Sequence, residues 1–90
     1  MRVLWSPAAL REVLAIHDYL ALFNPPAAVR VMTALIEAGD RLAAFPHRGR
    51  HVPGTGCREL TVAPPYVIRY EVVSDSVHIL RVRHRARRTT

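Results

Sequence analysis

The sequence predicts an α+β domain in which a hairpin of two helices packs on one face of a twisted antiparallel sheet. Three observations lead to this fold class: a strand-like run over residues 1–5, two amphipathic helical patterns between residues 7 and 45, and three strand-like runs between residues 57 and 83. The element order is therefore β-α-α-β-β-β. A chain of 90 residues has the length of one domain, so we expect a single domain over residues 1–90.

Each predicted helix begins at a polar residue that is followed by proline. Ser6 and Asn24 can accept hydrogen bonds from the free N–H groups of a first helical turn, and Pro7 and Pro25 suit the first helical position. The first helix is expected to run from about Pro7 to Leu22. Its apolar face comprises Leu10, Val13, Leu14, His17, Leu20 and Ala21.

The second helix is expected to end near Phe45. Its apolar stripe comprises Ala28, Val31, Met32, Leu35, Ala38 and Leu42. Gly39 within this helix lowers the stability of the helix by about 1 kcal/mol relative to alanine. Because the link between the two helices is so short, they are expected to form an antiparallel hairpin.

The remaining residues predict a loop and a meander of strands. Residues 46–56, "PHRGRHVPGTG", are rich in proline and glycine and predict the loop. Strands are expected over residues 57–62, 66–73 and 77–83. Alternation places Tyr66 and Tyr70 on one face, where core packing is their expected role. The last strand is apolar on both faces up to its middle, which indicates a central strand that is covered on both sides.

The charge of the chain favours an acidic partner. All thirteen basic residues are arginines, and seven acids leave a net charge of +6, which suits binding to an acidic protein or a nucleic acid. The single cysteine, Cys57, excludes an internal disulfide. The N-terminus lacks the apolar core of a secretory signal, and no apolar run is long enough to span a bilayer. We therefore expect a cytoplasmic protein that does not act at a membrane.

Positive charge gathers at the end of the last predicted strand. The cluster comprises Arg81, Arg83, Arg85, Arg87 and Arg88, with His84 among them. Arg81 and Arg83 are expected on the same side of the strand. The cluster has two interpretations. It is either a solvated chain end or a binding site for an acidic partner or for phosphates. In the second reading, Arg58 and Arg69 would extend the site.

Other reactive side chains favour structural roles. His47 and His51 lie near Cys57, but no second cysteine or carboxylate completes a zinc site, so we expect neither a metal nor a cofactor. Cys57 is expected to pack as a small hydrophobic residue. His17 is expected to be a packed histidine, and Glu59 an ion-pair partner rather than a general base.

Six fragments of the sequence together carry a family resemblance. In chain order they are "WSPAAL", "NPPAA", "FPHRGR", "REL", "PPYVIRYEV" and "HILRVRHRARR". Over nearly its whole length the chain resembles the RelE/ParE superfamily of bacterial toxins from type II toxin–antitoxin modules. The resemblance implies the same β-α-α-β-β-β fold. It also implies a hetero-oligomer with a cognate antitoxin, encoded by an adjacent gene, whose C-terminal segment folds over the helices and exposed sheet of the toxin.

Two kinds of target occur within this superfamily. RelE-like members cut mRNA on the ribosome, whereas ParE-like members poison DNA gyrase. RelE-like enzymes carry an arginine where this sequence has Val67, and they use loop lysines and a tail tyrosine; this chain has no lysine and ends at Thr90. The candidates for a ribonuclease are His84 as the acid and Arg85 as the phosphate clamp, with Arg81 beside them.

We therefore expect a growth-inhibiting, ParE-like binder rather than an enzyme. The alternative is a RelE-like endoribonuclease that acts on ribosome-bound mRNA. A third possibility is a module that binds nucleic acid and has lost toxicity; it would keep the basic cluster and cause no growth defect.

Overall fold

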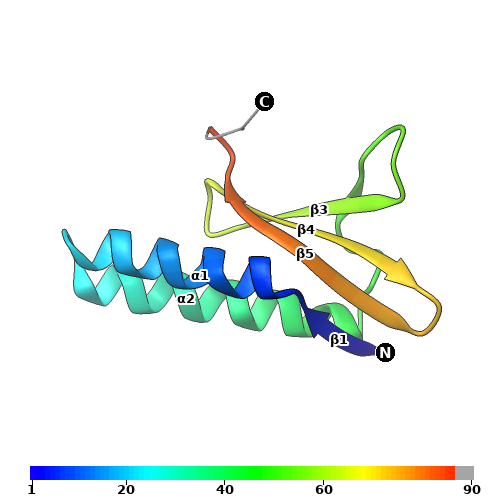
Figure 1. The fold of residues 1–90 in the computed structure, drawn as a ribbon, viewed down its shortest axis with the longest axis horizontal. Helices are drawn as coiled ribbons and strands as arrows, with labels where there is room; N and C mark the ends of the chain where they lie inside the picture. Colours follow the sequence, from blue (N-terminus) through cyan, green and yellow to red (C-terminus); the bar gives the residue numbers. More distant parts are fainter. Residues whose placement is uncertain (87–90) are drawn as a thin grey trace.

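A helix hairpin lies along one side of a five-stranded sheet in the structure, a computed structural model that describes residues 1–86 (Figure 1). Arg87, one of the candidate phosphate-binding residues, and Arg88 lie outside the described residues. The elements are β1 (Arg2–Trp5), α1 (Pro7–Ala21), α2 (Pro25–Asp40), the 3-10 turn η1 (Arg41–Ala43), β2 (Arg50–His51), β3 (Cys57–Val62), β4 (Tyr66–Val73) and β5 (Ser76–His84).

Both predicted helix caps are confirmed. The Ser6 hydroxyl accepts a hydrogen bond from the Ala9 N–H at 3.0 Å. The Asn24 side-chain oxygen accepts one from the Ala27 N–H at 3.1 Å. Such caps satisfy donors that a first helical turn leaves free. The second helix ends at Asp40, earlier than expected, and the chain continues through η1.

The sheet is mixed, so the expectation of an all-antiparallel sheet is wrong at one edge. The strand order is β1-β5-β4-β3-β2, and β1 pairs in parallel with β5, whereas the other pairs are antiparallel. The alternation of a short edge strand is the same for either direction, so the sequence holds no local signal for it. The predicted loop also contains β2, because Arg50 pairs with Glu59 and His51 with Arg58.

The core lies between the helices and one face of the sheet. Its largest fully buried side chains are Tyr70, Leu35, Leu42, Ile68, Ile79, Val77 and Val82. The predicted packing role of Tyr66 and Tyr70 is confirmed, because both are buried. None of the helices within residues 1–86 has the length and apolar character needed to cross a membrane.

The buried face of α1 differs from the predicted one. Ala9 and Val13 are buried, with Ile16 and Leu20 packed beside them, whereas Leu10 and Leu14 are 44% and 57% exposed. The buried stripe is shifted toward Ala9 and Ile16, on the side of α1 that packs against α2 and β5. Beyond the sheet, the tip of the hairpin projects into solvent (Figure 1). Leu22 at this tip is largely exposed.

Gly39 is required by the ring of Trp5, which packs across α2. A Cβ on Gly39 would lie 2.6 Å from Trp5 Cη2 and 2.9 Å from Ile79 Cδ1. The ring is held in place because Trp5 Nε1 donates a hydrogen bond to Asp40 Oδ1 at 3.1 Å. The cost of glycine in this helix is therefore offset by the close approach of an aromatic ring to the backbone.

Replacing Gly39 by alanine is expected to destabilise the protein. Helix propensity alone would stabilise the variant by about 1 kcal/mol, but overpacking at a contact this close costs about 1–3 kcal/mol. Urea unfolding of the Gly39→Ala variant measures the balance. In a Trp5→Ala background the same substitution is expected to be neutral or stabilising, and equal destabilisation in both backgrounds would contradict this explanation.

Candidate functional site

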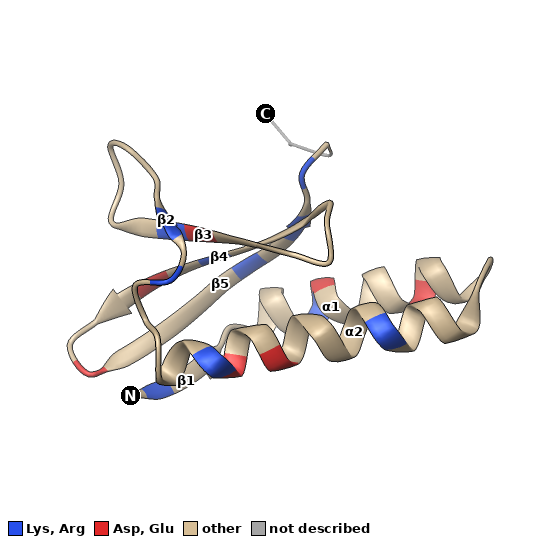
Figure 2. Ribbon diagram, turned by 180° about the vertical axis from the view of Figure 1, so that it is seen from behind, with Lys and Arg blue, Asp and Glu red and all other residues tan. Residues whose placement is uncertain are grey.

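An arginine-lined cleft of about 500 Å³ opens on the sheet. It is lined by Arg50, Val52, Glu59, Val67, Arg69, Arg81, Arg83, His84 and Arg85. Arginine positions on β2, β4 and β5 gather in this part of the sheet (Figure 2). We call it the arginine cleft. It contains most of the predicted binding residues and all three candidate catalytic residues, Arg81, His84 and Arg85.

A β-bulge at Leu80 turns the arginines of β5 into the cleft. Val77 and Ile79 point into the core, and strict alternation would place residue 81 there too. The register instead shifts, because Tyr70 pairs with Ile79 and Arg69 pairs with Arg81. The extra residue makes Val82 the next buried side chain. Arg81 and Arg83 therefore share the outward side, as predicted.

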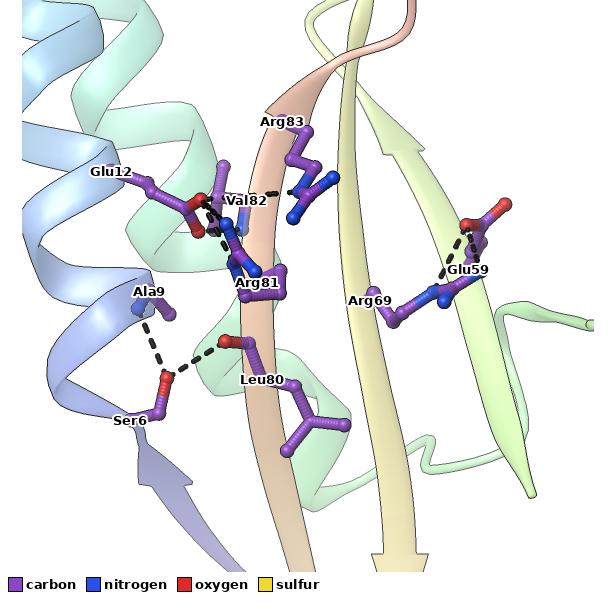
Figure 3. Close-up of polar contacts among 9 residues, drawn as sticks. All are labelled: Ser6, Ala9, Glu12, Glu59, Arg69, Leu80, Arg81, Val82 and Arg83. Carbon is purple, nitrogen blue, oxygen red and sulfur yellow. Dashed lines mark hydrogen bonds and ion pairs between the residues drawn. The ribbon is translucent and has the colours of Figure 1, made fainter. Parts of the chain in front are cut away.

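Two partly buried carboxylates hold the arginines of the cleft. Glu12 Oε2 accepts hydrogen bonds from Arg81 Nε at 2.9 Å and Nη2 at 2.7 Å, and it lies 4.0 Å from Arg83 Nε (Figure 3). Glu59 Oε2 accepts from Arg69 Nε at 3.2 Å and Nη2 at 3.0 Å, and Glu59 Oε1 accepts from Arg50 Nη2 at 3.3 Å. Glu59 is thus an ion-pair partner, as predicted.

The contact with Glu12 also stabilises the charged form of Arg81. The side-chain hydrogen bond to Glu12 raises the pKa of Arg81 above its already high usual value; desolvation opposes this rise, and the negative charge of Glu12 adds a smaller contribution to it. Like other arginines in proteins, Arg81 is a permanent cation. It can bind an anion or stabilise developing negative charge, but it cannot act as a proton donor at neutral pH.

His84 and Arg85 lie at the end of β5, next to the β3–β4 turn. The Arg85 backbone N–H donates to the Pro65 carbonyl oxygen at 2.8 Å, and Arg85 Nη2 donates to the Thr61 hydroxyl at 2.6 Å. The His84 ring stands edge-on to Tyr66, with ring centroids 5.5 Å apart. His84 Nδ1 accepts a hydrogen bond from the Ala86 N–H at 3.1 Å. The ring and the guanidinium are thus held by local contacts.

Arg58 does not line the cleft, contrary to the expectation that it would extend the site. Its Nη1 donates to the Gly49 carbonyl oxygen at 2.8 Å and the His47 carbonyl oxygen at 3.3 Å. The buried hydroxyl of Tyr70 anchors the same loop, because it donates to the Pro46 carbonyl oxygen and accepts from the Gly49 N–H, both at 2.8 Å. Arg58 therefore holds the loop that leads to β2.

Glu12 is the site residue that sequence reasoning missed. The signal was its place on α1, three residues after Ala9 and directly before Val13, at the border of the buried stripe. A carboxylate at such a border needs a partner. Within residues 1–86, no group of three histidine, cysteine, aspartate or glutamate side chains is gathered that could hold a metal ion.

Comparison with known proteins identifies the family. The family model for the ParE toxin of the type II toxin–antitoxin system parDE matches residues 3–89. The chain belongs to the ParE toxin family. The ParE-like β-α-α-β-β-β fold expected from the sequence is confirmed by a solved structure titled as the chromosomal ParDE toxin–antitoxin system from P. aeruginosa. It superimposes with a TM-score of 0.82 at 25% identity and covers 93% of this chain and 95% of that one.

Two of three curated relatives of this ParE-family toxin carry the name RelE. Toxin RelE2 of Caulobacter vibrioides is 50% identical over 86 residues, which cover 96% of this chain and 97% of that toxin. The putative toxin Y4kP of Sinorhizobium fredii is 39% identical, covering 92% of this chain and 86% of that protein. Toxin RelE1 of Caulobacter vibrioides is 38% identical, covering 91% and 90%. The chain is therefore a type II toxin of the RelE/ParE superfamily.

Proposed function

We propose that this ParE-family toxin inhibits growth by binding DNA gyrase through the arginine cleft, and that it does not cut RNA. The observation that carries the proposal is that arginines engage both nearby carboxylates, Glu59 in the lining of the cleft and Glu12 next to it. Cleavage at a ribose 2′-OH needs a general base, a general acid and cations for the developing charge. The cleft offers cations, but the carboxylates of Glu12 and Glu59 already accept hydrogen bonds from arginines, which occupies the oxygens that a general base would need.

The lining of the cleft also favours binding of DNA gyrase over cleavage of RNA. Val67 pairs with Arg83 and lies at the position where RelE-like enzymes carry an arginine. An aliphatic side chain there cannot stabilise the negative charge of a phosphorane, and Val67 is buried at 9% exposure. Arg81 is a permanent cation and does not supply a proton. A surface of fixed cations suits an acidic protein partner.

A RelE-like ribonuclease is the second candidate, and one observation favours it. His84 and Arg85 lie in the same cleft, so an acid and a phosphate clamp are within reach of one substrate. In this alternative His84 would protonate the leaving group and Arg85 would hold the phosphate.

We further propose that a cognate antitoxin, encoded by an adjacent gene, neutralises the toxin. Leu10 and Leu14 on α1, and Leu22 and Phe23 at the hairpin tip, are exposed apolar side chains. The net charge of the chain is +6. An acidic amphipathic segment that lays apolar residues along α1 would match both properties.

Induced expression in a bacterial host without the antitoxin distinguishes the two targets. We expect activation of a DNA-damage reporter and filamentous cells, with translated mRNA intact, because a trapped topoisomerase leaves broken DNA. The His84→Ala variant is expected to remain toxic. Rapid cleavage of translated mRNA, mapped by its new 5′ ends and abolished by His84→Ala, would instead establish the ribonuclease. If expression caused no growth defect, the result would favour the third possibility, a non-toxic module that binds nucleic acid.

A further inference from the structure

Glu12 joins α1 to the edge of β5, the strand that carries Arg81 and Arg83. β1 pairs with β5 through Ile79, so among residues 1–86 no strand lies beside β5 on that edge beyond this point. α1 takes the place of a strand there. The Ser6 hydroxyl donates to the Leu80 carbonyl oxygen at 2.8 Å, and Glu12 Oε1 accepts from the Val82 N–H at 2.8 Å (Figure 3).

The two oxygens of Glu12 therefore have different partners. Oε1 holds the backbone just after the bulge, and Oε2 holds the guanidinium of Arg81. The side chain of Glu12 is 23% exposed, whereas those of Arg81 and Arg83 are 42% and 37% exposed. An ion pair this accessible adds little to stability. Its geometric effect is larger, because a two-point hydrogen bond from Nε and Nη2 restricts the plane of the guanidinium.

We propose that Glu12 is a positioning residue. It orients the guanidinium group of Arg81 toward the target by hydrogen bonds, and that of Arg83 by its negative charge. Arg81 uses Nε and Nη2 for Glu12, which leaves its Nη1 group to face a ligand in the cleft. A long arginine side chain loses much rotamer freedom when it binds an anion. Glu12 imposes that restriction before the target arrives, and a preorganised contact binds more tightly than a mobile one.

The charge of Glu12 makes the proposal distinguishable from a simple electrostatic effect. Its carboxylate cancels one positive charge next to the cleft. If charge alone mattered, removing it would strengthen binding of an acidic target. If Glu12 acts by positioning, removing its charge should instead weaken target binding, because Arg81 would lose its orientation.

The test uses Glu12→Gln, which keeps the shape of the side chain and one oxygen for the Val82 N–H. We expect the toxin level needed for half-maximal growth arrest to rise roughly tenfold, as for the loss of one charge-assisted hydrogen bond. The Arg81 Nε–Hε resonance in NMR spectra of the purified toxin should lose its hydrogen-bonded shift. Glu37→Gln, the same change at an exposed position of α2, is the matched control and should alter neither readout.

A second variant separates positioning from charge. Glu12→Asp keeps the charge but withdraws the carboxylate by one methylene, so it is also expected to reduce toxicity. Unchanged or increased toxicity of a folded Glu12→Gln variant, or full toxicity of Glu12→Asp, would overturn the proposal. Because the inference rests on the target-binding role of the arginine cleft, Arg81→Ala is tested in parallel. Full toxicity of Arg81→Ala would refute that role, whereas loss with Arg81→Ala but not with Glu12→Gln would refute the inference alone.

Discussion

Alanine at both Arg81 and Arg85 is expected to abolish growth arrest and leave the fold intact. Each side chain presents a cation to the arginine cleft, and neither belongs to the buried core. Truncating a charged group that meets an acidic partner at a desolvated contact weakens binding strongly. Two such losses together should raise the toxin level needed for growth arrest by more than about 100-fold. Growth curves after induction, with the toxin quantified in the cells, measure the effect.

The matched control replaces two arginines elsewhere. Arg30 on α2 and Arg41 in η1 are exposed and lie outside the cleft. The Arg30→Ala/Arg41→Ala variant has the same net charge as the cleft variant and should remain fully toxic. Equal loss of toxicity in both variants would mean that net charge acts, not the cleft. Full toxicity of a folded cleft variant would mean that the arginine cluster is only a solvated chain end.

The second large effect concerns the antitoxin. Its binding is expected to raise the free energy of unfolding by about 4 kcal/mol when free antitoxin exceeds its dissociation constant a thousandfold. The reason is that a small domain leaves much apolar surface uncovered; here Leu14 and Phe23 are 57% and 72% exposed. Thermal unfolding of the toxin, with and without the protein encoded by the adjacent gene, measures the shift.

The exposed leucines of α1 provide the control for that experiment. Leu10→Asp/Leu14→Asp changes two side chains outside the core, so the unfolding midpoint of the isolated toxin should change little. The added stability from the antitoxin should be largely lost, because two apolar contacts become charged groups facing an acidic segment. A midpoint that the neighbour-encoded protein leaves unchanged in the native toxin would contradict the proposed partner.

Several elements of the fold followed from local signals in the sequence. Ser6-Pro7 and Asn24-Pro25 determined where the helices begin, because caps act within a single turn. Alternation in the strand of residues 66–73 identified Tyr66 and Tyr70 as core residues. The same rule placed Arg81 and Arg83 on one side of their strand. The family also followed from the sequence, since its six fragments span the chain.

Other features depended on contacts between distant segments. The parallel pairing of β1 with β5 joins residues about seventy positions apart, and nothing in "MRVLW" selects it. Helix propensity makes Gly39 unfavourable in α2, and only the tertiary structure places the ring of Trp5 against it. The exposure of Leu10 and Leu14 depended on which side of α1 meets α2 and β5.

For the candidate site, the sequence by itself determined that arginines and His84 gather at the end of the last strand. The tertiary structure decided which of them share a cleft: the bulge at Leu80 turns Arg81 outward, and the loop contact removes Arg58. It also brought in Glu12, across a separation of 69 residues from Arg81. The physical reason is that composition and periodicity report local preferences, whereas strand register and ion-pair partners are determined by the packing of the whole chain.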